Sequence, residues 1–346
     1  MRRSFVFAAL VCLTSRLGAQ AVLSISGSVV GLNGVPLPYS TVSIAETGVA
    51  RFTDESGRFI MAGLRPGSYH LHVRQLGFTA VDTLLTIAPG ASQQVRIELK
   101  PTAFKLAAVT VKASRGCATA EEAAKSGTNF ALIIDELRNN AERERILVRS
   151  YPFIYRHARS VDRRASTGRP FTVHDTTSYR SDTRPRYKPG EIVRPDPDRP
   201  PPNNQQIMIP VLEDIGDPEF LRSHCFNYAG ITRENGVAMY RIDFEPVRSL
   251  KKPDIEGSFL LDTGSFVIRR ATLRLTRANQ VDLSLREVSV TTDYSEILPG
   301  VTVIGDLVSV QTQGSVGLSA PLRLTEKQHL IDYQFLGTKP GAPQRE

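Results

Sequence analysis

Short apolar runs recur along residues 22–100, and glycine, proline, asparagine or aspartate separates them. Within residues 69–73 apolar and polar positions alternate, which places Leu71 and Val73 on one face and His70 and His72 on the other. Seven short strands separated by turn residues predict a β-sandwich. The expected strands span residues 22–30, 40–45, 50–53, 58–62, 69–76, 81–87 and 94–99.

Helical periodicity is clear in one later stretch, residues 118–147. Thr119, followed by Glu121 and Glu122, supplies a cap and negative charge for the start of a helix. We therefore expect one amphipathic helix here. Its apolar positions recur at the spacing of a single face: Phe130, Ile133, Ile134, Leu137 and Ala141.

Strand-like alternation returns in the rest of the chain, interrupted by an expected proline-rich loop at 185–204 and a short helix from Glu219. The pattern predicts a second domain, residues 117–338. A linker strand at 101–116 precedes it and a disordered tail at 339–346 follows it. The expected antiparallel strands span residues 146–157, 169–179, 236–244, 255–262, 265–276, 281–293, 301–313 and 326–335.

The N-terminus has the three parts of an export signal. Arg2 and Arg3 form a positive start, residues 5–13 are apolar, and Ala19-Gln20-Ala21 offers a cleavage site. We predict a signal peptide at 1–21 and an exported protein, located in the periplasm, at the outer membrane or outside the cell. No later stretch is apolar for about 18 residues, so we expect no transmembrane helix.

The net charge of +8 is spread along the chain rather than gathered in one block. Arginines are frequent between residues 156 and 199, but Asp162, Asp175 and Asp196 interleave with them. Such a diluted field argues against a nucleic-acid partner.

Removal of the signal peptide discards Cys12 and leaves two cysteines, Cys117 and Cys225. In an oxidising compartment two cysteines predict one disulfide, with two buried free thiols as the alternative. The bridge would attach the start of the predicted helix to the strand region near Cys225.

The turns of the N-terminal domain follow a known pattern. Residues 25–78 resemble the carboxypeptidase regulatory-like domain, a transthyretin-like sandwich that is also described as starch-binding-like. The resemblance implies that these positions form turns and core rather than an active site. The matching residues are Gly27, Val29, Gly34, Pro36, Leu37, Pro38, Val42, Thr53, Asp54, Gly57, Phe59, Gly63, Leu64, Pro66, Gly67, Tyr69, Gly77 and Phe78.

Two further segments resemble envelope proteins. Residues 254–275 are similar to repeats of proteins with a LolA-like sheet, and the whole C-terminal region resembles uncharacterised bacterial envelope proteins. Residues 105–114 resemble the strand that follows the regulatory-like domain in TonB-dependent transporters, although too few residues remain for their barrel. The expected fold is therefore mainly β, a seven-stranded sandwich followed by a curved antiparallel sheet packed on one α-helix.

Candidate chemistry is sparse. Asp262-Thr263-Gly264-Ser265 matches the catalytic loop of aspartic proteases, but those enzymes need two carboxylates and the sequence has no second such motif. The same four residues also form an ordinary hairpin turn. No histidine is followed three residues later by glutamate or histidine, so the zinc-protease patterns are absent. We expect no catalytic residue, no metal and no cofactor.

These observations predict a non-enzymatic, exported envelope protein with a role in binding or assembly. Its partner would be an envelope protein, a glycan or a lipid. Because sugar platforms usually use exposed aromatic residues, the absence of tryptophan weakens the glycan interpretation. An accessory role in TonB-dependent transport and a lipid or lipoprotein carrier remain open alternatives, and a hydrolase that uses Asp262 is a third.

Overall fold

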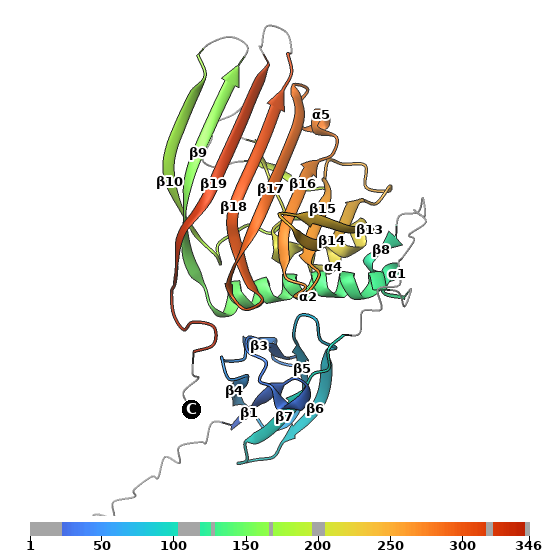
Figure 1. The fold of residues 1–346 in the computed structure, drawn as a ribbon, viewed down its shortest axis with the longest axis vertical. Coiled ribbons are helices and arrows are strands. Elements are labelled where there is room, and N and C mark those ends of the chain that lie inside the picture. Colours follow the sequence, from blue (N-terminus) through green and yellow to red (C-terminus); the bar gives the residue numbers. More distant parts are fainter. Residues whose placement is uncertain are drawn as a thin grey trace, which may run out of the picture.

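The computed structural model describes residues 23–102, 118–125, 129–165, 169–195, 205–315 and 321–342. A small N-terminal sandwich and a larger sheet lie on opposite sides of the long helix α2 (Asn129–Ser150) (Figure 1). The predicted signal peptide, residues 105–114 and Cys117 lie outside the described residues. None of the helices in the described ranges is long and apolar enough to cross a membrane.

The predicted N-terminal sandwich is confirmed. Its sheets have the orders β4-β1-β7 and β3-β2-β5-β6, and their facing sides bury Ile25, Val42 and Leu71 completely. The elements are β1 (Leu23–Val30), the short 3-10 helix η1 (Leu32–Gly34), β2 (Thr41–Ile44), β3 (Val49–Phe52), β4 (Arg58–Leu64), β5 (Gly67–Arg74), β6 (Val81–Ile87) and β7 (Gln93–Glu98).

The turn before β4 shows why the sandwich motif is structural. Asp54 Oδ1 accepts hydrogen bonds from the backbone N–H groups of Ser56 (2.9 Å) and Arg58 (2.8 Å). Gly57 between them has φ 74°, a conformation that favours glycine. These motif residues therefore form a turn.

The larger domain is a ten-stranded sheet in the order β10-β9-β19-β18-β17-β16-β15-β14-β13-β8, and every neighbouring pair is antiparallel. A separate two-stranded ribbon joins β11 (Val193–Pro195) to β12 (Gln205–Ile207). The strands of the sheet are β8 (Ala118–Thr119), β9 (Phe153–Ala165), β10 (Phe171–Arg180), β13 (His224–Glu234), β14 (Val237–Pro246), β15 (Ile255–Asp262), β16 (Ile268–Leu275), β17 (Leu285–Leu298), β18 (Val301–Gln313) and β19 (Leu322–Phe335).

The long helix differs from the one expected at 118–147, whereas the short helix expected from Glu219 is present as α4 (Pro218–Ser223). The predicted stretch contains α1 (Ala120–Lys125) and α2, and α2 continues to Ser150. The prediction of a strand from residue 146 was therefore wrong, because Ile146 and Leu147 extend the buried stripe of the helix and β9 begins at Phe153. Three short helices follow: α3 (Leu212–Ile215), α4 (Pro218–Ser223) and α5 (Ala278–Val281).

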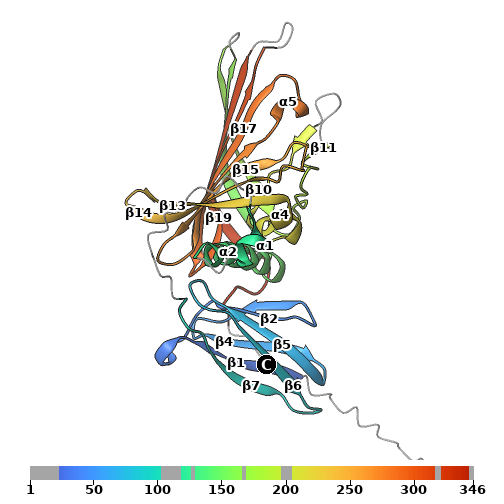
Figure 2. The same ribbon diagram turned by 90° about the vertical axis from the view of Figure 1, so that its right-hand side faces the viewer.

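The sheet bends over α2, and the face toward this helix is called the inner face (Figure 2). Ile133, Ile134 and Leu137 of α2 share one buried cluster with Phe259 and Leu273 of the sheet. Residues before β13, among them Tyr187, Ile192 and Phe220, complete this cluster. Strands β13 to β17 are thus covered on their inner face over most of their length, although Ile231 of β13, opposite Tyr240, is 51% exposed.

The opposite side of α2 packs on the sandwich. Phe52 of β3 stacks on Tyr151 with ring centroids 5.7 Å apart, and both belong to a cluster with Leu147 and Val301. Arg74 Nη2 lies 2.6 Å from Asp135 Oδ2 of α2. The helix is therefore shared by two cores.

A buried cation joins the two domains at this interface. Arg143 of α2 is 2% exposed and donates hydrogen bonds to Gln75 Oε1 of the sandwich (3.1 Å) and Gly300 O of the sheet domain (2.6 Å). Its guanidinium also lies 5.3 Å from the centroid of the Phe52 ring. Burial lowers its pKa to about 10, so it remains charged at neutral pH.

Candidate functional site

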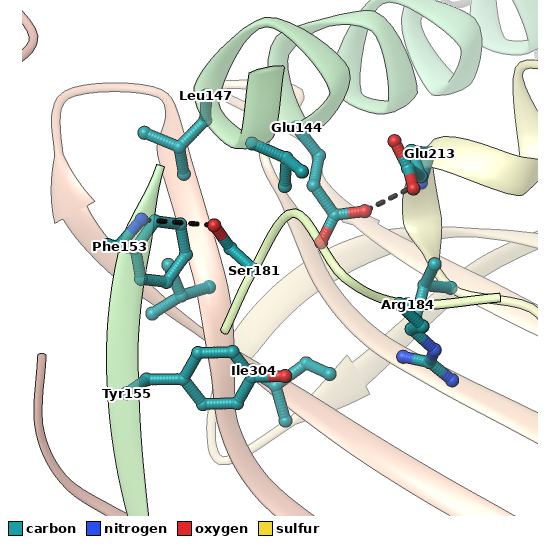
Figure 3. A pocket seen from close by; sticks show the side chains of 11 residues that line it. Glu144, Leu147, Phe153, Tyr155, Ser181, Arg184, Glu213 and Ile304 are labelled. Atoms are coloured by element: carbon teal, nitrogen blue, oxygen red, sulfur yellow. Dashed lines mark hydrogen bonds between the residues drawn. The ribbon is translucent and has the colours of Figure 1, made fainter. Parts of the chain in front are cut away.

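A small pocket lies between the C-terminal part of α2 and the sheet (Figure 3). Apolar side chains such as Leu147, Phe153 and Ile304 line most of it, and Glu144 points across it toward Glu213. Glu144 Oε2 accepts a hydrogen bond from the Glu213 backbone N–H at 2.6 Å. The cavity volume of about 40 Å³ has room for roughly two or three water molecules.

Glu144 is a half-buried acid in this pocket. Burial raises its pKa to about 8, and burial also raises the pKa of nearby Asp214. The pocket hydroxyl, Ser181 Oγ, accepts the Phe153 backbone N–H at 3.0 Å, and no hydrogen bond joins it to Glu144 in the part of the chain described. The pocket can hold a proton, but it does not pair a nucleophile with a base.

Beyond α2 the inner face is much less covered. We call this region the open half and define it as residues 157–165 of β9, 171–179 of β10, 305–313 of β18 and 322–330 of β19. The covered inner face of β13 to β17 is the closed half. The open half extends away from α2 in Figure 1.

Apolar side chains on the inner face of the open half keep contact with water. The strand registers place Val173 opposite Val161 and Phe171 opposite Arg163, while Leu324 of β19 pairs with the same Arg163. Phe171 is 48% exposed and Val173 44%. Val161, Leu307, Leu322 and Leu324 are half-buried.

Charged groups cross this apolar surface in one network. Arg159 of β9 donates to Glu326 Oε1 of β19 and to Asp175 Oδ2 of β10, both at 2.8 Å. One guanidinium thus pairs with two carboxylates, so the network carries a net charge of −1. The inner face of the open half is amphipathic.

An aromatic cluster marks the boundary between α2 and the open half. Tyr155, His157 and Tyr179 have ring centroids 5.3–6.2 Å apart. His157 is 1% exposed, its Nε2 lies 3.2 Å from Ile304 O, and burial lowers its pKa. The neutral ring therefore donates from Nε2, and Nδ1 has no hydrogen-bond partner among the described residues.

The aspartic-protease motif forms a hairpin turn. Asp262 Oδ1 accepts the backbone N–H groups of Gly264 (2.9 Å) and Ser265 (2.8 Å) and the Ser265 hydroxyl (3.0 Å). Although burial opposes it, this set of hydrogen bonds lowers the pKa of Asp262. The carboxylate therefore fixes the connection between β15 and β16.

The two strand histidines do not share a ligand site. His70 Nδ1 lies 2.6 Å from Glu46 Oε1, and His72 hydrogen-bonds Asp82 instead. Leu71 and Val73 are buried as expected from the alternation. No cluster of three or more metal-ligating side chains occurs within the described ranges.

Cys225 is 4% exposed on β13, where it pairs in register with Thr119 of β8. Its predicted partner Cys117 precedes β8 but lies outside the described residues. The disulfide between these two cysteines stays a prediction.

Glu144 and His157 were not among the candidate residues derived from the sequence. A signal for Glu144 was present, because it continues the helical series of Leu137 and Ala141 at i+7 and i+3. His157 gave no comparable signal, since its burial depends on a neighbouring strand far away in the chain.

Residues 24–100 match the family model of the carboxypeptidase regulatory-like domain. The sandwich is a carboxypeptidase regulatory-like domain. This confirms the resemblance read from its turns. The match covers less than a quarter of the chain, so it does not characterise the sheet domain. No curated protein matches the chain in sequence.

Several solved structures resemble the chain. A DUF1329 family protein from Desulfovibrio piger (9% identity, TM-score 0.32) covers 60% of this chain and 95% of its own. A LolA superfamily protein from Nitrosomonas europaea has 10% sequence identity and a TM-score of 0.28, and the match covers 58% of this chain and 94% of that protein. A putative outer membrane lipoprotein-sorting protein domain from Vibrio parahaemolyticus has 11% sequence identity and a TM-score of 0.32, and the match covers 59% of this chain and 92% of that domain. These include the LolA-like proteins named by the sequence resemblance, but such low TM-scores carry no functional argument.

Proposed function

We propose that this chain is a non-catalytic binding protein of the bacterial envelope that holds an apolar chain, such as the acyl chain of a lipid or lipoprotein, on the inner face of its open half. One observation supports this proposal above others: Phe171 and Val173 are nearly half exposed on an inner face that continues a buried core. Contiguous exposed apolar surface in an exported protein is typical of a binding site.

The form of the surface suits a flexible apolar ligand. Half-buried leucines of β18 and β19 continue the row from β10, so an extended chain would contact several strands in succession. The Arg159 network crosses the same face and offers polar partners for an ester or headgroup. Neither the Glu144 pocket nor the Asp262 turn provides a catalytic pair that would favour an enzyme.

The test compares one valine on each face of the sheet. Val173 lies on the inner face, whereas Val308 pairs with Thr291 and Lys327 on the outer face and has similar exposure. Binding is measured with the fluorescent apolar probe N-phenyl-1-naphthylamine, and the lack of tryptophan keeps the background low.

We expect Val173→Asp to weaken probe binding about tenfold and Val308→Asp to leave it unchanged, because only the first places a charge under the ligand. Native mass spectrometry of protein purified from the envelope should also show co-purified lipid. Equal binding by the two variants, or no binding by the unmodified chain together with a ligand-free mass, would contradict the proposal.

A second candidate is glycan binding by the sandwich. A groove of about 770 Å³ is lined by polar groups, including Ser26, Ser28, Gln94 and Arg96. Its aromatic members Phe52 and Phe59 are buried, so the groove offers hydrogen bonds without a stacking platform. A glycan array with no hit for the full chain would remove this candidate.

A further inference from the structure

Strand β10 forms one edge of the ten-stranded sheet. Among the described strands β9 is its one partner in the sheet, and their pairing runs without a register shift from Phe171 to Arg180. An edge strand presents a row of unpaired N–H and C=O groups, and proteins normally block such an edge with proline, bulges or inward charges. Residues 171–180 contain no proline and no bulge, and nine of the ten are exposed. Their one inward carboxylate, Asp175, is paired with Arg159 of the neighbouring strand.

We propose that β10 pairs antiparallel with β10 of a second copy of this chain, centred on Thr176. A symmetric antiparallel pair places one residue opposite its own copy, and this condition limits the possible registers. A centre at Asp175 would oppose two carboxylates, and a centre at His174 would oppose two imidazoles. A centre at Thr177 would bring His174 opposite Arg180.

The Thr176 centre avoids each of these conflicts. It places Val173 opposite the second copy's Tyr179, which is a favourable pairing of a β-branched with an aromatic side chain. It also places Asp175 opposite the second copy's Thr177, and Asp175 keeps its ion pair with Arg159. Like charges do not face each other anywhere along residues 172–180 in this register.

The same register keeps the two inner faces on one side. Val173 and Tyr179 both belong to the inner face, so their pairing would join the two open halves into one continuous surface. The strand pairing itself does not depend on the proposed ligand. Its test therefore succeeds or fails separately from the lipid-binding test.

The experiment is a cysteine crosslink in the full chain. Thr176→Cys places two thiols across the two-fold axis, where paired residues are close enough for a disulfide. Ser178→Cys is the matched control, because it lies on the same outer face but four residues away from its counterpart in the second copy. This offset of about 14 Å is too long for a disulfide.

We expect about tenfold more crosslinked dimer from Thr176→Cys than from Ser178→Cys after mild oxidation. Sedimentation velocity should show twice the monomer mass for the unmodified chain and monomer for Thr176→Lys, which opposes two cations at the axis. Equal crosslinking at both positions would overturn the register. Monomer at every concentration, or a dimer that survives Thr176→Lys, would overturn the interface.

Discussion

The closed and open halves of the sheet have the same alternation of apolar and polar residues, but their apolar side chains differ in how far they are buried. In the closed half, Phe259 of β15 is completely buried and stacks on Phe244 with centroids 4.8 Å apart. In the open half, Phe171 of β10 is 48% exposed and lies against the Arg163 guanidinium. Alternation assigns a side chain to a face, but the element above that face decides whether it is buried.

Element size explains why one sheet has both halves. Strands of 13 or 14 residues, such as β18 and β19, are about 45 Å long, whereas a helix is about 10 Å wide. Helix α2 crosses the strands near one end, so it covers a short part of β9, β18 and β19. The residues before β13 cover the inner face of β13 to β17, and the open half keeps an uncovered apolar surface.

The largest contrast should come from truncating one phenylalanine in each half. We expect Phe259→Ala to lower the free energy of unfolding by about 3–5 kcal/mol, because it leaves a cavity in a closed core. Phe171→Ala should cost less than about 1 kcal/mol and should instead weaken binding of the apolar probe. Urea unfolding followed by circular dichroism measures both, and similar losses would contradict the distinction between the halves.

The predicted Cys117–Cys225 disulfide would strengthen the closed half alone. It would tie the segment before β8 to β13, the strand next to β8 in the sheet. Its closure of a loop of about 110 residues would stabilise the protein by up to about 4–5 kcal/mol. Reduction should therefore lower the urea midpoint of the chain, and a Cys117→Ser, Cys225→Ser variant should not respond to the reductant. Two thiols alkylated without reductant would contradict the bridge.

Two arginines allow a third comparison. Arg143→Ala removes a buried cation from the contact between sandwich and sheet domain and leaves acceptors such as Gly300 O unpaired, so we expect a loss of about 2–4 kcal/mol. Arg159→Ala removes a partly exposed network in the open half and should cost about 0–1 kcal/mol. Thermal unfolding followed by circular dichroism compares them, and a smaller loss for Arg143→Ala would contradict its role as the joint between domains.

The sequence correctly predicted those features of the fold that depend on residues close together in the chain. Turn residues identified the sandwich, and alternation placed Leu71 and Val73 in its core. The sequence did not predict which strands would lie under α2, because β9 follows the helix directly yet pairs with β19 near the end of the chain. The open half, the burial of His157 and the edge at β10 all depend on this long-range pairing. Glu144 was missed because the helical series was read from apolar residues alone, and a glutamate at the next position of that series does not add to it.

The smallest expected effect concerns Glu144 and depends on pH. Its pKa of about 8 lies above the ordinary value of 4.5, so the folded state binds a proton that the unfolded state releases. The stabilisation is complete below about pH 4.5 and is lost as the pH rises toward 8. Glu144→Gln keeps an acceptor for the Glu213 N–H and cannot ionise, so it should be more stable than the unmodified chain at pH 8. The full pKa shift would correspond to about 4 kcal/mol at this pH, and because the side chain is only half-buried we expect about 1–2 kcal/mol after screening by water.

Urea unfolding at several pH values tests this prediction, and Glu142→Gln is a control on a partly exposed turn of the same helix. Burial also raises the pKa of Glu136 to about 7, so Glu144→Gln should reduce the pH dependence without abolishing it. If Glu144→Gln gained nothing over the Glu142 control at pH 8, the Glu144 carboxylate would be solvated. The pocket under α2 would then belong with the open half, and the boundary between the two halves would move toward the helix.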